Sequence, residues 1–211
     1  IEHLPVPFFK LIKDVSSLME HKAKSKGLDF CLDYHFPLPS MIVTDPTRLK
    51  QIIINLVGNA IKFTEFGFVR IAISIDENQL VIDVEDSGIG ISESNIRKLF
   101  CAFEQVGDNS IDKFGGTGLG LNISKYLTQK LSGDLTVTSE IDQGSCFTAT
   151  VALVLARQCQ WVNSTKEVAA LSEFKQHQQV LSSALVGKVL LAEDNDAIRQ
   201  LITALLEKLG L

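Results

Sequence analysis

Glycines are concentrated in one short stretch of this chain, Gly115-Gly-Thr-Gly-Leu-Gly120, which leads directly into a helical pattern of apolar residues. The first backbone N–H groups of a helix have no partner within the helix, so such a helix start can bind an anion such as a phosphate. Glycine lacks the Cβ that would keep a phosphate away from the backbone. The stretch therefore indicates a phosphate-binding loop, and a flexible surface loop is the alternative.

A stripe of polar side chains follows one face of an otherwise apolar helix predicted over residues 46–63. Gln51, Asn55, Asn59 and Lys62 share that face, because residues three or four positions apart lie above one another on a helix. Asparagine is a poor helix former, so its repeated use needs another reason. Amide oxygens suit Mg²⁺, which combines a few protein ligands with water and phosphate oxygens. The stripe predicts a magnesium site, and an ordinary solvent-exposed face is the alternative.

A carboxylate followed by two glycines, Asp86-Ser-Gly88-Ile-Gly90, ends a predicted strand. An Asp-x-Gly sequence alone is typical of a plain turn. At the end of a buried strand, however, the Asp86 carboxylate could accept a hydrogen bond from an exocyclic amino group, while the glycines let a flat ring lie against the backbone. Adenine carries such an amino group, and guanine presents a different edge.

The periodicity of apolar residues predicts the elements that position these groups. In chain order we expect a helix over residues 7–26, a strand over 28–36, a helix over 46–63 capped by Asp45, a hairpin with strands 69–75 and 80–85, a short helix over 92–100, a helix over 119–131 and a second hairpin with strands 135–137 and 147–155. These elements define an α+β fold in which one mostly antiparallel sheet carries three helices on one face.

Composition excludes several classes of protein. The formal net charge is -5 and no segment is strongly basic, so nucleic-acid binding is not expected. The four cysteines lack the spacing of a zinc site or a disulfide framework, which fits the reducing cytoplasm. No apolar run is long enough to cross a membrane, and no signal peptide opens the chain.

The C-terminal part of the chain has a different organisation. We interpret residues 1–156 as one domain and the glutamine-rich residues 157–186 as an interdomain linker. Residues 187–211 contain one apolar run, an acidic pair at Glu193 and Asp194, and one helical pattern. A single strand and helix cannot bury their own apolar faces, so we expect a truncated start of a second domain.

Four ordered motifs together resemble the N, G1, F and G2 boxes of sensor histidine kinases: Asn55-x-x-x-Asn59-Ala-Ile-Lys62-Phe63-Thr64, Asp86-x-Gly88-x-Gly90, Phe100-x-x-Phe103 and Gly115-Gly-Thr-Gly-Leu-Gly120. The resemblance covers residues 7–155 and implies the Bergerat ATP-binding fold of the GHKL superfamily, a two-layer α/β sandwich with a mixed sheet. Val189-Leu-Leu-Ala-Glu-Asp-Asn195 is likewise similar to the first strand and acidic pair of a receiver domain. The layout implied is a hybrid sensor histidine kinase.

The resemblance implies ATP and Mg²⁺ as cofactors and a role for each matched residue. Asn59 would hold the magnesium, Asn55 would assist the metal or the phosphates, and Lys62 would face the phosphates. Asn55 and Lys62 would thus be the catalytic residues, with Asn59 and Asn55 as metal ligands. Asp86 would bind the adenine amino group and Phe63 would pack on the ring. The other ATP-binding residues implied are Gly88, Gly90, Gly116, Thr117, Gly118, Leu119, Gly120 and Ser145.

The chemistry of Asn55 bears on the branch of the superfamily. ATPases of this superfamily that activate water place a glutamate there as general base, and asparagine cannot take a proton. A neutral histidine is already nucleophilic and needs no base at that position. Asn55 therefore favours phosphoryl transfer to histidine over hydrolysis, with the enzyme acting by positioning and charge neutralisation.

The chain also departs from the family pattern. His3, His21, His35 and His177 are not followed by the acidic residue and proline of the H box. The acceptor histidine is therefore expected on dimerisation helices upstream, where any inner-membrane anchor would also lie, and a homodimer is expected only for the full-length protein. Asp112 stands where many relatives carry a basic residue. It motivates the alternative of a degenerate nucleotide-binding or protein-interaction module without kinase activity.

Overall fold

The structure is a computed structural model that describes residues 1–96, 99 and 119–171. The chain divides into two compact units, Ile1–Thr165 and Lys166–Leu211. Of the second unit, residues 166–171 are described and are helical. The predicted receiver start over residues 187–211, and the predicted linker from residue 172 onward, lie outside the described residues.

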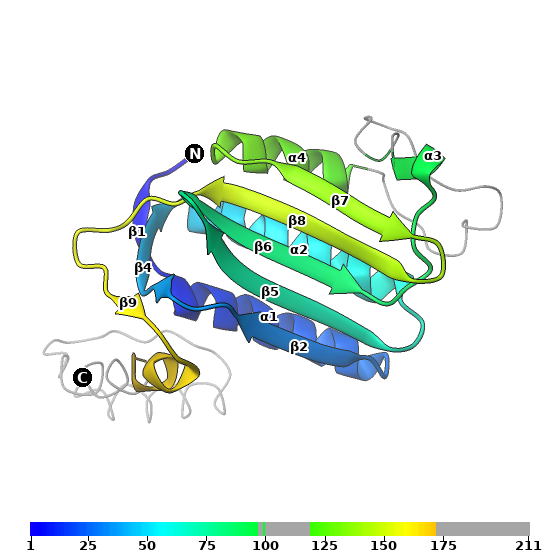
Figure 1. Cartoon of the computed structure of the whole chain (residues 1–211), viewed down its shortest axis with the longest axis horizontal. Coiled ribbons are helices and arrows are strands. Elements are labelled where there is room, and N and C mark those ends of the chain that lie inside the picture. Colours follow the sequence, from blue (N-terminus) through cyan, green and yellow to red (C-terminus); the bar gives the residue numbers. More distant parts are fainter. Residues whose placement is uncertain (97–98, 100–118, 172–211) are drawn as a thin grey trace, which may run out of the picture. The chain divides into compact units, whose positions relative to one another are not determined.

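Five strands form the central sheet of the first unit in the order β2-β5-β6-β8-β7 (Figure 1). Their bounds are β2 Asp29–Tyr34, β5 Phe68–Asp76, β6 Gln79–Asp86, β7 Leu135–Glu140 and β8 Gly144–Ala152. β2 runs parallel to β5, and the other neighbouring pairs are antiparallel. The prediction of a mixed, mostly antiparallel sheet is confirmed, as are both predicted hairpins.

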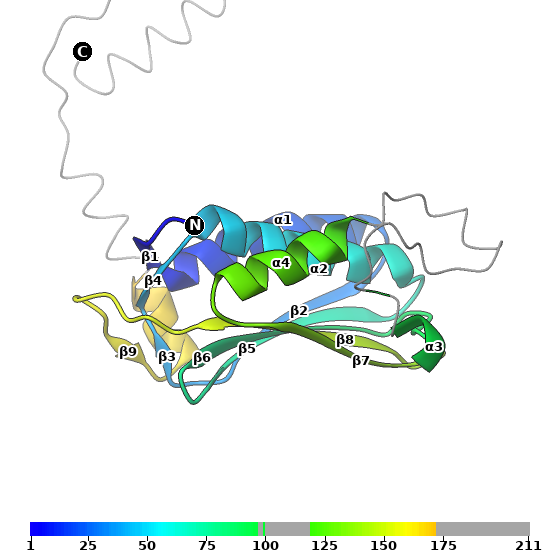
Figure 2. The same cartoon turned by 90° about the horizontal axis from the view of Figure 1, so that it is seen from above.

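Three helices cover one face of this sheet: α1 Phe8–Ser25, α2 Pro46–Phe63 and α4 Gly120–Lys130 (Figure 2). The predicted layer arrangement is thus confirmed. Ile52, Ile53 and Leu56 of α2 are fully buried, as are Ile71 and Ile82 of the sheet. Burial of each such side chain contributes about 1.5–3 kcal/mol, so α2 is held firmly against the sheet. A short helix, α3 Glu93–Ile96, falls within the predicted helix 92–100, whose residues 97, 98 and 100 are not described.

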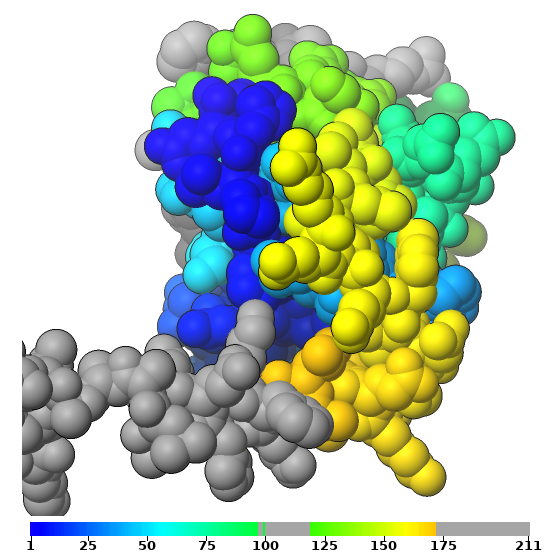
Figure 3. Space-filling model, turned by 90° about the vertical axis from the view of Figure 1, so that its left-hand side faces the viewer, coloured from blue at the N-terminus to red at the C-terminus, as the bar shows by residue number. Residues whose placement is uncertain are grey.

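Two small pairs of strands lie at the end of the unit where the N-terminus is found. β1 Leu4–Pro7 pairs with β4 Met41–Thr44, and β3 Leu38–Pro39 pairs with β9 Trp161–Val162. Figure 3 views the molecule from this end, where the N-terminal segment lies beside the chain that follows β8. These four strands were not predicted from the sequence, because two to four residues are too few for an alternating pattern to be recognised. β9 lies in the stretch that we interpreted as a linker.

Side-chain hydrogen bonds stabilise both ends of helix α2. Asp45 caps its first turn, because Oδ1 of Asp45 accepts the N–H groups of Thr47 at 3.1 Å and Arg48 at 3.0 Å. Pro46 occupies the first helical position, as predicted. At the other end, the Lys26 ammonium donates to the carbonyl oxygens of Ile61 and Lys62 at 2.7 and 2.9 Å.

Candidate functional site

Gln51, Asn55 and Asn59 of the polar stripe line a pocket of about 680 Å³ between α2 and α4. The pocket residues are Thr47, Lys50, Gln51, Ile54, Asn55, Gly58 and Asn59 of α2, and Gly120, Ile123 and Ser124 of α4. The face that carries these residues therefore looks toward the first turn of α4. The structure brings the predicted phosphate-binding helix start and the predicted metal ligands to one place.

Asn55 is held between two residues of α4. Its Nδ2 donates to Oγ of Ser124 at 2.8 Å, and Ser124 is itself buried, with 1% of its surface exposed. A Cβ placed on Gly120 would lie 2.4 Å from Oδ1 of Asn55, which is closer than any real contact. Glycine at position 120 thus lets the helix start approach the Asn55 amide, and the amide presents its oxygen on the side of that helix start.

Lys62 and Phe63 lie at the last turn of α2, outside the pocket between α2 and α4. The Lys62 ammonium sits 4.7 Å from the centre of the Phe63 ring. Both residues are half-buried. The two bonds from Lys26 to the end of α2 hold the backbone of this turn in place, so Lys26 positions the predicted phosphate-facing lysine.

Asp86 ends β6 in a buried position, with 5% of its surface exposed. Burial raises the pKa of its carboxyl group, while hydrogen bonds from the backbone N–H groups of Gly88 and Ser145 oppose that rise. The Gly88 N–H reaches Oδ1 of Asp86 at 2.9 Å. The carboxylate is thus placed by backbone groups of the loop after β6 and of β8, and it is kept away from bulk water.

The loop after Asp86 is packed against both α2 and the turn between β7 and β8. The Ile89 N–H points to the carbonyl oxygen of Phe63 at 3.4 Å, and the Asp142 N–H donates to the carbonyl oxygen of Ile89 at 3.0 Å. Gly90 has a φ of +66°, and a Cβ there would lie 1.9 Å from the carbonyl oxygen of Glu140. No other residue type fits at position 90 without moving the β7–β8 turn.

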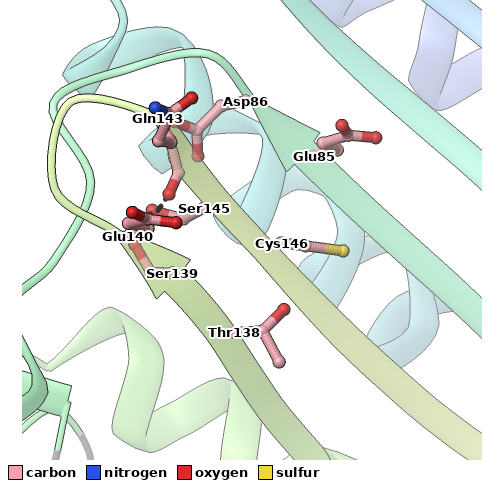
Figure 4. Close-up of a pocket in the computed structure, with 9 residues that line it drawn as sticks. Glu85, Asp86, Thr138, Ser139, Glu140, Gln143, Ser145 and Cys146 are labelled. Atoms are coloured by element: carbon pink, nitrogen blue, oxygen red, sulfur yellow. Dashed lines mark hydrogen bonds between the residues drawn. The ribbon is translucent and has the colours of Figure 1, made fainter.

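A second pocket, of about 370 Å³, opens at the ends of β6, β7 and β8 (Figure 4). It is lined by Glu85, Asp86, Thr138, Ser139, Glu140, Gln143, Gly144, Ser145 and Cys146. Ser145 is the cross-strand partner of Asp86 in the β6–β8 pair. The structure therefore brings together the two predicted base-binding residues that come from different hairpins.

The predicted site residues thus fall into groups. Asn55, Asn59 and Gly120 share the first pocket, and Asp86 and Ser145 share the second. Lys62, Phe63, Gly88 and Gly90 line neither pocket but lie on the turn and loop between them, and Leu119 is the residue before α4. Gly116, Thr117 and Gly118, the F-box residues Phe100 and Phe103, and Asp112 lie outside the described residues.

Three side chains that support these groups were not predicted from the sequence: Ser124, Lys26 and Ser139. Ser124 lies 69 positions from Asn55 in the sequence, and Lys26 lies 35 from Ile61. The local signal of Ser124 and Lys26 is a polar residue on a predicted helix or at its end, and that of Ser139 is a polar residue just after a predicted strand. Their partners come from distant segments and could not be inferred from spacing.

Two further observations concern metals and membranes. Within residues 1–96, 99 and 119–171, no group of three or more His, Cys, Asp and Glu side chains is arranged to hold a metal ion. No helix in the same part of the chain is long and apolar enough to cross a membrane.

The sequence profile of the family described as "Histidine kinase-, DNA gyrase B-, and HSP90-like ATPase" matches residues 44–155. The aerobic respiration control sensor protein ArcB of Escherichia coli K12 is 42% identical over 153 residues, which cover 72% of this chain and 20% of ArcB. The signal transduction histidine-protein kinase BarA of the same organism is 40% identical over 152 residues, covering 70% and 17%. The chain thus spans about a fifth of the length of these relatives.

Solved structures share the fold. Full-length ShkA in complex with AMPPNP superposes with a TM-score of 0.65 at 34% identity, covering 73% of this chain and 32% of ShkA. The catalytic domain of the histidine kinase ThkA, in a nucleotide-free form, gives a TM-score of 0.61 at 28% identity, covering 72% of this chain and 96% of that domain.

The chain belongs to the family of histidine kinase-, DNA gyrase B- and HSP90-like ATPases. Within that family, it contains a histidine kinase catalytic domain of the kind found in sensor kinases such as ArcB and BarA.

Proposed function

We propose that this chain binds Mg-ATP and supplies the γ-phosphoryl group to a histidine on a dimerisation domain encoded upstream, in two-component phosphorelay signalling. The observation that carries the proposal is the pocket lined by Asn55 and Asn59 of α2 and by Gly120 at the start of α4. An amide-lined helix face opposite a glycine-led helix start suits a metal-bound triphosphate.

The donor set of the first pocket fits magnesium. Asn59 and Asn55 would hold the ion through their amide oxygens, and Mg²⁺ combines such oxygens with water and phosphate oxygens. When bound, the ion neutralises charge on the transferring phosphates. The chain itself would position the phosphates through the backbone of Gly116, Thr117, Gly118, Leu119 and Gly120, and through the Lys62 ammonium.

The adenine base would bind where Asp86 and Ser145 line the second pocket, beside the loop that carries Gly88 and Gly90. Asp86 would accept from the exocyclic amino group, and the buried carboxylate is held ready by the backbone N–H groups of Gly88 and Ser145. Gly88 and Gly90 would let the ring lie against the loop, and Phe63 would pack on it from the end of α2. ShkA, which shares this fold, was solved with AMPPNP, an analogue of ATP.

The Asn55 side chain favours transfer over hydrolysis. An amide has no proton affinity comparable to that of a carboxylate, so it cannot deprotonate a water molecule. Its Nδ2 is moreover engaged by Ser124 at 2.8 Å. We therefore expect little steady release of phosphate from this chain when no acceptor histidine is supplied.

The remaining partners follow from the same proposal. The dimerisation and histidine-phosphotransfer helices would lie upstream, a receiver domain would begin at residue 187, and residues 157–186 would link the two. The autoinducer 2 sensor kinase/phosphatase LuxQ of Vibrio vulnificus, 31% identical over 95% of this chain, supports a common layout of the C-terminal stretch. The domain would work in the cytoplasm, where ATP is available, and the full-length protein would be a homodimer.

Calorimetric titration with ATP, with and without magnesium, tests the proposal. Asn59→Ala should abolish the gain in affinity that magnesium provides, and Asp86→Asn should weaken binding in both conditions. Asn78→Ala, in the exposed β5–β6 turn, is the matched control and should bind as the wild type does. Absence of heat for the wild-type chain at millimolar ATP would overturn the proposal and favour the interaction-module alternative. Phosphate release in the absence of an acceptor would favour a water-using ATPase.

A further inference from the structure

Ser139, near the end of β7, makes hydrogen bonds to three other residues and has no role in the proposed function so far. Its Oγ accepts the Ile91 N–H at 2.8 Å and donates to the Gly144 carbonyl oxygen at 2.8 Å. It also lies 3.0 Å from Oγ of Ser145 (Figure 4). One hydroxyl thus joins the loop after Asp86 to the beginning of β8.

The direction of the third contact follows from the number of hydrogens. A serine hydroxyl has one hydrogen and two lone pairs. The Gly144 carbonyl can only accept, so the Ser139 hydrogen is directed to it. In the contact between Ser139 and Ser145, the hydrogen must therefore come from Ser145. With that hydrogen engaged, the Ser145 hydroxyl offers only lone pairs to its remaining surroundings.

Ser145 shares the second pocket with Asp86 and is its cross-strand partner. Asp86 is an acceptor when ionised, and Ser145 is made an acceptor by Ser139. The pocket therefore presents two acceptors side by side. A 6-amino purine brings N–H donors to such a pair, whereas a 6-keto purine brings a carbonyl oxygen that meets two acceptors there.

We propose that Ser139 is a positioning residue that makes the base pocket selective for a 6-amino over a 6-keto purine. It does so in two ways: it anchors the loop after Asp86 through Ile91, and it holds the Ser145 hydroxyl as an acceptor. The inference rests on the proposed binding of a purine nucleotide in this pocket. It assigns a role in base selectivity to Ser139, which lies outside the four motifs.

Ser139→Ala removes the partner of the Ser145 hydrogen, which can then rotate and donate to a ligand carbonyl. The test is calorimetry of the full chain with ATP and with inosine triphosphate, which carries a carbonyl in place of the amino group. We expect the ATP affinity of Ser139→Ala to fall about tenfold and the inosine triphosphate affinity to change less than about threefold. The ratio of the ATP affinity to the inosine triphosphate affinity should therefore fall. Ser139→Thr keeps the hydroxyl and should restore the wild-type ratio.

Two further variants complete the test. Thr136→Ala removes a hydroxyl from the exposed face of the same strand and should leave both affinities unchanged. Ser145→Ala removes the acceptor itself but keeps the hydrogen bond between Ser139 and Ile91. It should also lower the ratio of the ATP affinity to the inosine triphosphate affinity. This variant tests the proposal even if Ser139→Ala does not fold. Equal losses for both nucleotides in Ser139→Ala, or an unchanged ratio in both serine variants, would overturn the inference. Failure of the wild-type chain to bind ATP would instead overturn the proposed function.

Discussion

The carboxylate of Asp45 joins the N-terminal segment to the helix that carries Asn55 and Asn59, and its replacement by alanine tests how much this junction contributes. Oδ1 accepts the two N–H groups of the first turn of α2, and Oδ2 accepts the Glu2 N–H at 3.0 Å. Only 4% of the Asp45 surface is exposed. Alanine would leave all three donors without this partner.

The expected loss can be worked from these contacts. Replacing an N-cap aspartate by alanine costs about 1 kcal/mol and up to about 2 kcal/mol. Losing the additional bond to Glu2, in a partly buried site, costs about 1 kcal/mol more. We therefore expect Asp45→Ala to lower the free energy of unfolding by about 2–3 kcal/mol, which corresponds to a decrease in Tm of about 4–12 °C for a domain of this size.

Acidity provides an internal check on this reasoning. Burial tends to raise the pKa of Asp45, but the N–H groups of Glu2, Arg48 and Thr47 outweigh it, so the pKa lies below its ordinary value. A carboxyl group with a lowered pKa in the folded state stabilises the fold above its unfolded pKa of about 4, and this contribution is lost as the pH falls through the folded pKa. Asp45→Asn cannot titrate. The stability difference between wild type and Asp45→Asn should therefore shrink in acid.

Urea unfolding followed by far-ultraviolet circular dichroism measures these differences. The single tryptophan of the chain, Trp161 in β9, reports separately on the β3–β9 pair by its fluorescence. Asp45→Asn should lose less stability than Asp45→Ala, because its amide oxygen can still cap α2. An Asp45→Ala protein within 0.5 kcal/mol of wild type, or a difference between wild type and Asp45→Asn that stays constant into acid, would refute the reasoning.

Three other substitutions probe the supports of the site. Lys26→Met removes the ammonium that holds the last carbonyls of α2 and should cost about 1 kcal/mol in urea unfolding; Lys24→Met, which breaks an exposed i,i+4 ion pair, should cost less than about 0.5 kcal/mol. Ser124→Ala frees the Asn55 amide and should weaken Mg-ATP binding about fivefold in calorimetry, with little effect on ATP alone; an equal loss in both conditions would contradict this. Gly90→Ala forces a side chain into backbone at a φ of +66° and should cost more than about 2 kcal/mol and abolish the thermal shift caused by ATP.

Much of the fold could be predicted because its signals are local. The cap at Asp45, the amphipathic helix α2 and the hairpin of β5 and β6 each follow from residues a few positions apart, and the structure has them where expected. The left-handed residue Glu77, with a φ of 49°, lies in the predicted turn. Strands β1, β3, β4 and β9 could not be predicted, since they form only because a partner from a distant segment arrives beside them.

In the candidate site, too, some features have local sequence signals and others depend on distant segments. The residue types and their order, from Asn55 to Ser145, are sufficient to predict phosphate, metal and base chemistry. The sequence alone could not show that Ser124 engages Asn55 across 69 positions, or that Ser139 engages Ile91 across 48. Such bonds depend on how helices and hairpins pack.

The sequence by itself therefore determined which chemical groups this protein possesses and on which elements they lie, because helix and strand periods act over neighbouring residues. Only the tertiary structure decided which of those groups meet and in which direction their hydrogen bonds run. The physical reason is that a hydroxyl or an amide acquires its role as donor or acceptor from the partner that faces it, and that partner is brought there by the packing of α4 and the pairing of β6, β7 and β8.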